Sequence, residues 1–269
     1  MRSLIESASN KKIKLVRELH QRKYRNREGL FLAEGVRLSE MAVHSDWRIE
    51  FALFTKEMAA EARGEKLLCD LEEKGCMLYE VPKALYDKVS DTESPQGVLL
   101  VMEKKAVDLQ ALLQTKKTPF FLVLDGVQDP GNAGTILRTA DAAGADGVIL
   151  LKGSVDMFSD KAVRSAMGSL FHLPICENVE REAFIKAVEG AGIPLFATAL
   201  DETARLYTEA DLKNSAAIVF GNEGNGVSEE ILLASKKLYI PMYGSAESLN
   251  VAAASAIVIY EAVRQRNMI

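Results

Sequence analysis

The stretch from residue 124 to residue 144 constrains the fold most, because it joins an apolar run to a Gly/Pro turn and then directly to a helical pattern. Asp129 and Pro130 are typical of the start of a turn, and Asn132 is a candidate cap for the following helix. The free N–H groups at the start of a helix attract anions. Arg138 lies off the apolar stripe of this helix and is able to face the same place. We therefore expect a ligand site at this turn.

The carboxyl-terminal part of the chain repeats this alternation of apolar runs and helical patterns. The predicted strands are 120–125, 147–151, 194–199, 215–220 and 238–241. The predicted helices lie near 133–143, 159–170, 181–190, 228–236 and 248–265. Strands that are apolar throughout and alternate with helices are typical of an α/β fold, in which helices cover both faces of a parallel sheet.

Shorter apolar runs alternate with helical stretches over 29–102, which indicates a small α/β domain. Residues 103–118 are charged and polar and form the best candidate for a linker, although 107–113 has the pattern of a short helix. We therefore expect an amino-terminal domain over 1–102 and a larger domain over 119–269. The length of 269 residues leaves one large α/β domain as the alternative.

The cysteines and the hydropathy exclude several classes of protein. Cys69, Cys76 and Cys176 are far apart, form no CxxC pair and have only three histidines to join them, so we expect neither a disulfide framework nor a metal site. No apolar run approaches the length of a membrane span, and the charged amino terminus is unlike a secretory signal. These features favour a cytoplasmic protein with no membrane partner.

The net charge of −5 hides a strong asymmetry. Residues 1–30 hold nine Lys and Arg against three Glu, a net +6, so the rest of the chain carries −11. A basic segment on an acidic body is typical of RNA-binding proteins, and Tyr24 is available to stack on a base. A solvated basic helix face is the alternative. The candidate RNA contacts in this segment are Lys11, Lys12, Arg22, Lys23 and Arg25.

A second glycine-rich stretch, 221–228, follows a predicted strand and precedes a helix that Ser228 is able to cap. Its spacing is GxxGxG rather than the GxGxxG of dinucleotide-binding sites, and the chain has no GxxxxGK[ST]. A tight turn is the structural alternative. Glu223 weighs against it, because a carboxylate between glycines at the carboxyl end of a strand lies where α/β proteins bind ligands.

A third polar stretch, 239–250, leads into a long helix whose small residues over 251–257 permit close packing against another segment or helix. A simple helix cap at Ser248 or Asn250 is the alternative to a role in a site. The carboxyl ends of parallel strands meet on one side of a sheet. We therefore expect five polar side chains to converge on one pocket: Asn132, Arg138, Glu223, Ser248 and Asn250.

Three segments, 129–140, 221–226 and 240–250, together resemble motifs 1, 2 and 3 of the SpoU (TrmH-type) RNA 2′-O-ribose methyltransferases. The resemblance extends over about 120–265 and includes 161–174, which contains Arg164. Residues 29–102, with Arg37 in the sequence FLAEGVR, look like the substrate-binding domain, related in fold to ribosomal protein L30e, that many rRNA-directed members carry. Arg37 and Arg164 thereby join the candidate RNA contacts, with a plain helix surface as the alternative for Arg164.

The resemblance implies a SPOUT fold with a deep trefoil knot in the carboxyl-terminal domain, and a homodimer with the active site near the subunit interface. The helix after Asn250 would pack through the knot and against the partner subunit. The resemblance also implies S-adenosylmethionine as the methyl donor, held largely by backbone groups. The residues that match the donor site are Gly221, Ile240 and Leu249, with Thr198 and Ala199 nearby.

In this family, the arginine that matches Arg138 is assigned to activation of the 2′-hydroxyl. An arginine has a pKa of about 12.5 or more, so binding an RNA phosphate and stabilising the developing oxyanion are cheaper roles than that of a neutral base. The side chains that would orient Arg138 and the ribose are Asn132, Glu223, Ser248 and Asn250. We expect Glu223 to hold Arg138 directly, with a surface ion pair to Asp141 as the alternative. His172 is expected to be a packing residue.

With this resemblance, the chain is predicted to be an enzyme that uses S-adenosylmethionine to methylate a ribose 2′-hydroxyl of RNA. The amino-terminal domain favours 23S rRNA as the substrate. A tRNA ribose methyltransferase and a non-catalytic RNA-binding assembly factor are the alternatives. A nicotinamide-dependent oxidoreductase lacks its glycine fingerprint.

Overall fold

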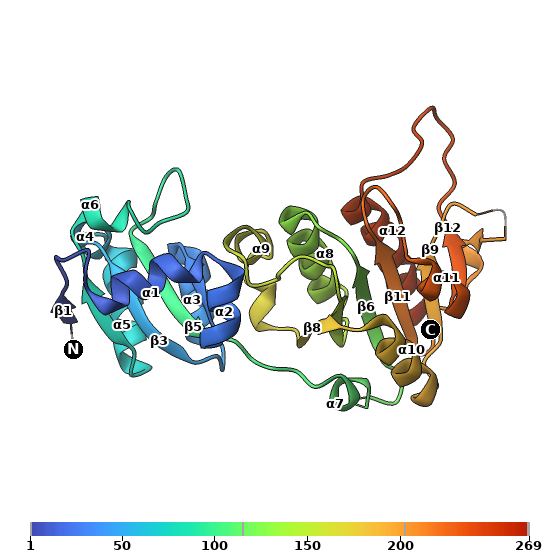
Figure 1. Ribbon diagram of the computed structural model, residues 1–269, viewed down its shortest axis with the longest axis horizontal. Helices are drawn as coiled ribbons and strands as arrows, with labels where there is room; N and C mark the ends of the chain where they lie inside the picture. The colour runs from blue at the N-terminus through green and yellow to red at the C-terminus, as the bar shows by residue number, and fades with distance from the viewer. Residues whose placement is uncertain (1, 115, 202, 268–269) are drawn as a thin grey trace. The chain divides into compact units, whose positions relative to one another are not determined.

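A computed structural model describes residues 2–114, 116–201 and 203–267 of the protein (Figure 1). The chain forms two compact units. One consists of Met1–Lys105 with Phe158–Phe171, and the other of Ala106–Met157 with His172–Ile269. The segment Phe158–Phe171 therefore packs with the first unit, although it lies within the stretch predicted as the larger domain. None of the described helices is long and apolar enough to cross a membrane.

The first unit contains a five-stranded mixed sheet. Its strands are β1 (Arg2–Leu4), β2 (Leu30–Glu34), β3 (Ile49–Phe54), β4 (Met77–Glu80) and β5 (Val98–Glu103). They lie in the order β1-β4-β3-β5-β2, and β5 runs antiparallel to both of its neighbours. β1 was not predicted, because this exposed edge strand of three residues carries no apolar pattern.

Helices pack on this sheet. They are α1 (Lys11–Leu19), α2 (Arg22–Glu28), α3 (Val36–His44), α4 (Lys56–Ala60), α5 (Ala62–Glu73), α6 (Lys83–Tyr86) and α9 (Asp160–Ser165). α1 begins after Asn10, whose side chain accepts a hydrogen bond from the Lys12 N–H at 2.9 Å. Its buried residues Ile13, Val16 and Leu19 recur at helical spacing, which fixes the helix against the core.

The segment around α9 differs from the single helix predicted over 159–170. α9 ends at Ser165, and a short 3₁₀ turn follows at Ser169–Phe171. Met167 and Gly168 between them have φ of 50° and 90°, values that a right-handed helix does not accept. Phe158 and Phe171 flank the segment, and both rings contact Trp47, at centroid distances of 6.2 and 5.7 Å.

The second unit contains a seven-stranded sheet in which every pair is parallel, as predicted. Its strands are β6 (Phe120–Asp125), β7 (Gly147–Leu151), β8 (Ile175–Val179), β9 (Leu195–Thr198), β10 (Arg205–Leu206), β11 (Ala216–Gly221) and β12 (Lys236–Tyr239). Only β8 and β10 were not predicted. They lie at the two edges of the order β10-β12-β9-β11-β6-β7-β8, where polar residues interrupt the apolar run.

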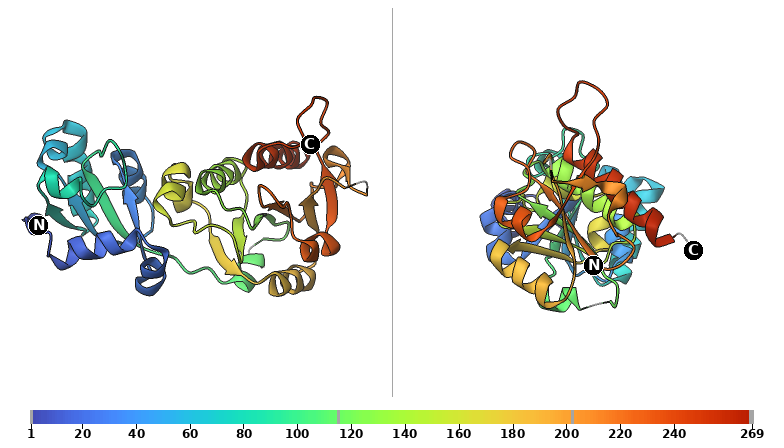
Figure 2. Two further views of the ribbon diagram at one scale, coloured as in Figure 1. Left: turned by 45° about the horizontal axis from the view of Figure 1, so that its top comes forward. Right: turned by 90° about the vertical axis from the view of Figure 1, so that its right-hand side faces the viewer.

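Helices cover both faces of this sheet (Figures 1 and 2). They are α7 (Leu109–Leu113), α8 (Pro130–Ala142), α10 (Arg181–Gly190), α11 (Glu229–Ala234) and α12 (Val251–Asn267). Phe121 and Val123 of β6 point to the face packed by α7, α10 and α11. α8 and α12 pack against each other on the opposite face. This alternation along the strand is the pattern of a sheet buried on both sides.

The order of the strands places a topological switch between β6 and β11. From β6 the chain continues to β7 and β8 on one side, whereas β9, β12 and β10 lie beyond β11 on the other. The loops that leave β6 and β11 therefore diverge at the carboxyl edge of the sheet, which is where open α/β sheets bind their ligands.

Candidate active site at the sheet switch

The turn after β6 begins the site. Asp129 precedes α8, and its Oδ1 accepts a hydrogen bond from the Asn132 N–H at 2.9 Å. Asp129 is thus the cap and Pro130 the first residue of the helix, so the prediction of Asn132 as the cap is wrong. Asn132 lies in the first turn of α8, and its side chain extends to the neighbouring loops.

Glu223, in the loop after β11, holds this turn. Its Oε1 accepts hydrogen bonds from Asn132 Nδ2 at 2.9 Å and from the Asp129 N–H at 3.2 Å, and its Oε2 accepts one from the Gln128 N–H at 3.2 Å. Burial raises the pKa of Glu223, but the hydrogen bonds from Asn132 and the backbone outweigh burial, so the pKa is lowered. The carboxylate is therefore ionised at neutral pH.

Asn250 joins the third polar stretch to the other two. Its Nδ2 donates to Asn132 Oδ1 at 3.1 Å, and its Oδ1 accepts from the Ala252 N–H at 2.9 Å and the Ala253 N–H at 3.3 Å. Asn250 is thus both the cap of α12 and a partner of Asn132. Glu223, Asn132 and Asn250 form one hydrogen-bonded chain across the three predicted motifs. Ser248 is exposed beside this chain and forms no hydrogen bond with a described residue.

Arg138 does not join this chain. Its side chain is exposed, and it forms neither a hydrogen bond nor an ion pair with any described residue, so the predicted contact with Glu223 is wrong within one chain. Arg138 lies six residues after Asn132, which is about 9 Å along the helix axis and roughly 120° around it. The alternative ion pair is also absent, because Asp141 pairs with His172 at 2.8 Å. His172 is exposed, so its predicted packing role is wrong too.

A cavity of about 650 Å³ lies beside the hydrogen-bonded chain. The loops after β9, β11 and β12 and the start of α12 form its wall. Eight of the predicted site residues line it: Thr198, Ala199, Gly221, Glu223, Ile240, Ser248, Leu249 and Asn250. Its volume lies in the range of small-molecule sites, about 300–1,000 Å³. The predicted donor residues therefore share one cavity, which holds apolar side chains next to exposed backbone.

The loop after β11 depends on two residues for its shape. A Cβ atom at Gly221 would lie 2.1 Å from the Gly226 carbonyl carbon, so this position has no room for a side chain. Asn222, which was not among the predicted site residues, closes the loop. Its Oδ1 accepts from the Gly224 and Asn225 N–H groups, both at 2.9 Å, and its Nδ2 donates to the Gly126 carbonyl at 2.8 Å. Asn before Glu-Gly is a turn signal that could have identified it.

The candidate RNA contacts differ in exposure. Arg25 is 3% exposed and its Nη1 donates to the Leu19 carbonyl at 2.7 Å, so it stabilises the end of α1 and its prediction as an RNA contact is wrong. Lys12 is half-buried, with its ammonium 4.4 Å from the Phe51 ring centroid. Arg164 is partly exposed and pairs with Asp91 at 3.0 Å. The fully exposed candidates are Lys11, Arg22, Lys23 and Arg37.

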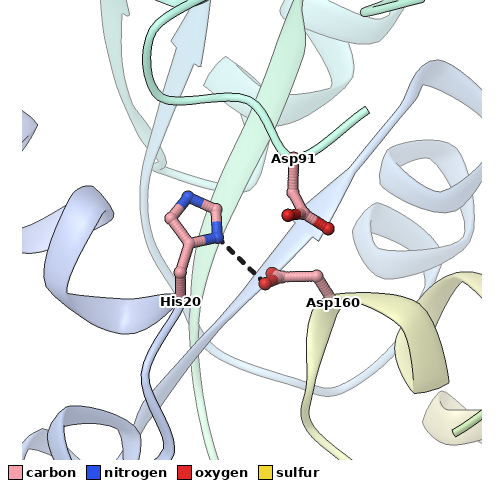
Figure 3. A group of neighbouring side chains, drawn as sticks. All are labelled: His20, Asp91 and Asp160. Carbon is pink, nitrogen blue, oxygen red and sulfur yellow. Dashed lines mark hydrogen bonds and ion pairs between the residues drawn. The ribbon is translucent and has the colours of Figure 1, made fainter. Parts of the chain in front are cut away.

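One cluster of His and Asp side chains lies outside this site, in the first unit (Figure 3). His20 Nδ1 lies 2.9 Å from Asp160 Oδ2, and His20 Nε2 lies 2.9 Å from the Val89 carbonyl oxygen. Since that carbonyl only accepts, Nε2 carries a proton, and a protonated Nδ1 then suits the carboxylate. The hydrogen bond to Asp160 is the main cause that raises the pKa of His20. Asp91 has Arg164 as its cation, so the cluster is an ion network.

Comparison with known proteins places these features in context. The model of the SpoU rRNA Methylase family matches residues 119–260, and that of the MRM3-like substrate binding domain matches residues 10–100. The 23S rRNA (guanosine(2553)-2′-O)-methyltransferase RlmP of Bacillus subtilis is 38% identical over 257 residues, which cover 95% of this chain and 97% of the relative.

Solved structures agree over nearly the whole chain. The AdoMet-bound rRNA methyltransferase from Sinorhizobium meliloti has a TM-score of 0.88 and 32% identity, with 98% of each chain covered. The SpoU methyltransferase AviRb from Streptomyces viridochromogenes, in complex with AdoMet, has a TM-score of 0.84 and 31% identity, with 96% of this chain and 99% of that chain covered.

Proposed function

Because this chain belongs to the SpoU rRNA methylase family, we propose that it transfers a methyl group from S-adenosylmethionine to a ribose 2′-hydroxyl of 23S rRNA. Family membership makes it an S-adenosylmethionine-dependent RNA methyltransferase. The choice of 23S rRNA rests on a relative of that specificity that matches over 97% of its own length. The amino-terminal substrate-binding domain supports the same choice over tRNA.

The main support for this proposal is the position of the cavity next to the hydrogen-bonded chain. The cavity beside Gly221, Ile240 and Leu249 meets the hydrogen-bonded chain of Glu223, Asn132 and Asn250 at the switch point of the sheet. The apolar side chains and backbone groups of the cavity suit an adenine and its ribose, which fits S-adenosylmethionine. When bound, this donor supplies an electrophilic methyl group. A donor site next to a rigid polar chain is the arrangement that methyl transfer to a hydroxyl requires.

The polar chain would orient the acceptor. Asn132 is fixed at both ends of its amide, because Nδ2 donates to the ionised Glu223 and Oδ1 accepts from Asn250. A fixed amide and carboxylate hold the ribose without reorganisation, and such positioning contributes up to ~7–11 kcal/mol in well-oriented systems. Ser248 lines the cavity, and its hydroxyl, which has no hydrogen-bond partner among the described residues, is able to bind a phosphate or ribose oxygen.

Arg138 would bind the phosphate next to the target ribose and stabilise the developing oxyanion. As the 2′-oxygen takes the methyl group, S-adenosylhomocysteine would leave and the hydroxyl proton would pass to solvent. Its guanidinium does not line the cavity of its own chain, which supports a homodimer in which Arg138 completes the partner's site. Ile257 and Tyr260 of α12 are exposed apolar residues, as a subunit interface requires. A trefoil knot in the second unit and a cytoplasmic location are parts of the same proposal.

The RNA would contact basic residues of the first unit. Lys11, Arg22 and Lys23 are exposed on α1 and α2, and Arg37 is exposed at the start of α3. Arg164 would contribute once an RNA phosphate competes with Asp91 for its guanidinium.

The test combines a binding and a mapping experiment. Calorimetry on the full chain is expected to show binding of S-adenosylmethionine and none of NAD. Incubation with 23S rRNA and the donor is expected to add a 2′-O-methyl group at one nucleotide, with no product on tRNA. Methylation of tRNA alone would refute the substrate, and binding of NAD alone would refute the reaction.

A further inference from the structure

β6 ends on a buried carboxylate. The side chain of Asp125 is 1% exposed, and its residue pairs in register with Gly221 of β11. A buried carboxylate requires compensating donors. Asp125 belongs to none of the three motifs, does not line the 650 Å³ cavity and has no part in the polar chain.

Its partners come from two other elements. Arg181 donates to Oδ1 from Nε at 2.8 Å and lies 2.7 Å from it through Nη2, and the Ser228 N–H donates to Oδ2 at 2.8 Å. Arg181 is the first residue of α10. A cation is unfavourable at the amino terminus of a helix, so the pairing with Asp125 accounts for an arginine at this position.

The carboxylate therefore connects α10 to the end of the donor-binding loop. Ser228 directly follows residues 221–227, of which every one lines the cavity. The pairing of β11 with β6 holds the start of this loop. The hydrogen bond from the Ser228 N–H to Asp125 holds its end. We propose that Asp125, held by Arg181, is a positioning residue that fixes the donor-binding loop for S-adenosylmethionine; this rests on the proposed function.

Both partners of Asp125 are donors, which makes the substitution Asp125→Asn informative. An amide has one accepting and one donating side, so an asparagine is able to satisfy either Arg181 or Ser228 but not both. Arg181→Lys keeps the positive charge and loses the planar pair of donors. In Asp125→Asn the loop end is therefore held only when the amide oxygen faces the Ser228 N–H, which leaves Arg181 without its acceptor. In Arg181→Lys the carboxylate still accepts from Ser228, but it loses the bidentate contact that fixes its orientation.

The experiment is calorimetry and steady-state kinetics on the full chain. Asp125→Asn and Arg181→Lys are expected to weaken S-adenosylmethionine binding about tenfold or more, while the KM for rRNA stays unchanged. The double variant is expected to bind no more weakly than Asp125→Asn, because the two residues act as a unit. Lys186→Gln is the matched control, since Lys186 forms an exposed ion pair with Glu182 on the same helix.

A structural role alone would lower the unfolding temperature without changing the donor affinity. Donor affinity equal to the unsubstituted protein in a folded Asp125→Asn variant would overturn the inference. If Asp125→Asn does not fold, Arg181→Lys carries the test by the same criterion. Failure of the unsubstituted protein to bind S-adenosylmethionine would instead refute the proposed function, so the two failures are distinguishable.

Discussion

At the scale of single residues, Gly221 sets the shape of the donor site. A Cβ atom there would lie 2.1 Å from the Gly226 carbonyl carbon and 2.2 Å from the Val227 nitrogen, and backbone atoms at such distances have to move. Gly221→Ala is therefore expected to weaken S-adenosylmethionine binding at least tenfold, measured by calorimetry. Gly190→Ala is the control, since a Cβ atom at Gly190 has no neighbour within 4 Å. Equal affinities of the two variants would contradict this account.

Substitution of Arg138 is expected to lower catalysis without lowering the stability of the fold. Its exposed side chain has no described partner, so Arg138→Ala should change the free energy of unfolding by less than about 0.5 kcal/mol. The same change should lower kcat by about 10²–10³-fold with unchanged donor affinity, because a charge that stabilises an oxyanion is lost. Single-turnover methylation measures this. Arg138→Lys with near-full activity would show that the planar guanidinium is not required.

Some contacts of the site residues could be predicted from the sequence, and others could not. Asn132, Glu223 and Asn250 could be grouped in advance, because each follows a strand of one parallel sheet. The direction in which the Arg138 side chain points could not be predicted, because it depends on whether Asn132 caps α8 or lies inside it. The helix starts at Pro130, and the helical repeat turns Arg138 away from Asn132. Burial of Arg25 was hidden for a similar reason, since its partner is the Leu19 carbonyl rather than a side chain.

At the scale of elements, the interior strands of the seven-stranded sheet were predictable and its two edge strands were not. β6, β7, β9 and β11 are flanked on both sides by other strands, and nearly all of their residues are buried and apolar. β12 is also an interior strand, but only Leu238 of it is buried, and the prediction covered just its apolar end. The edge strands β8 and β10 share their surface with solvent and lack this signal. The break after α9 arises from the conformations of Met167 and Gly168. The α/β class was predicted from the alternation of apolar runs and helical patterns, and the SpoU family and the methyl donor from the three motifs. All three predictions are confirmed.

The contact of α9 with the end of α1 is expected to depend on pH. The hydrogen bond to Asp160 raises the pKa of His20 above its ordinary value of 6.5. A group whose pKa is higher in the folded state than in the unfolded state stabilises the fold. This stabilisation is complete at a pH below the unfolded-state pKa and is lost as the pH rises through the folded-state pKa. The first unit should thus become less stable above about pH 6.5.

Urea unfolding of the full chain, followed by fluorescence, checks this at a series of pH values. The only tryptophan, Trp47, is buried in the first unit and reports its unfolding. His20→Gln should remove the pH dependence, whereas His44→Gln should keep it, because the His44 side chain forms no hydrogen bond with a described residue. An unchanged pH profile in His20→Gln would mean that this ion pair contributes nothing measurable.

At the scale of the whole molecule, we expect the second unit to bind the methyl donor and the first unit to bind the RNA, and a truncation tests this. Every residue that lines the 650 Å³ cavity belongs to the second unit, so a fragment of residues 106–269 should keep its affinity for S-adenosylmethionine. The fragment lacks the exposed basic residues of α1 and α2, so binding of rRNA should be lost. Calorimetry with the donor and filter binding with rRNA measure the two effects.

This truncation is also expected to cost stability, because the fragment retains Phe158–Phe171 without its partners. Phe158 and Phe171 are 2% and 7% exposed in the full chain and contact Phe31 and Trp47, which the fragment lacks. Uncovered aromatic rings favour aggregation, so the fragment should be less soluble than the full chain. Phe158→Ser and Phe171→Ser together should restore its solubility and leave donor affinity unchanged. A fragment that stays soluble without these changes but loses donor binding would show that the first unit shapes the donor site.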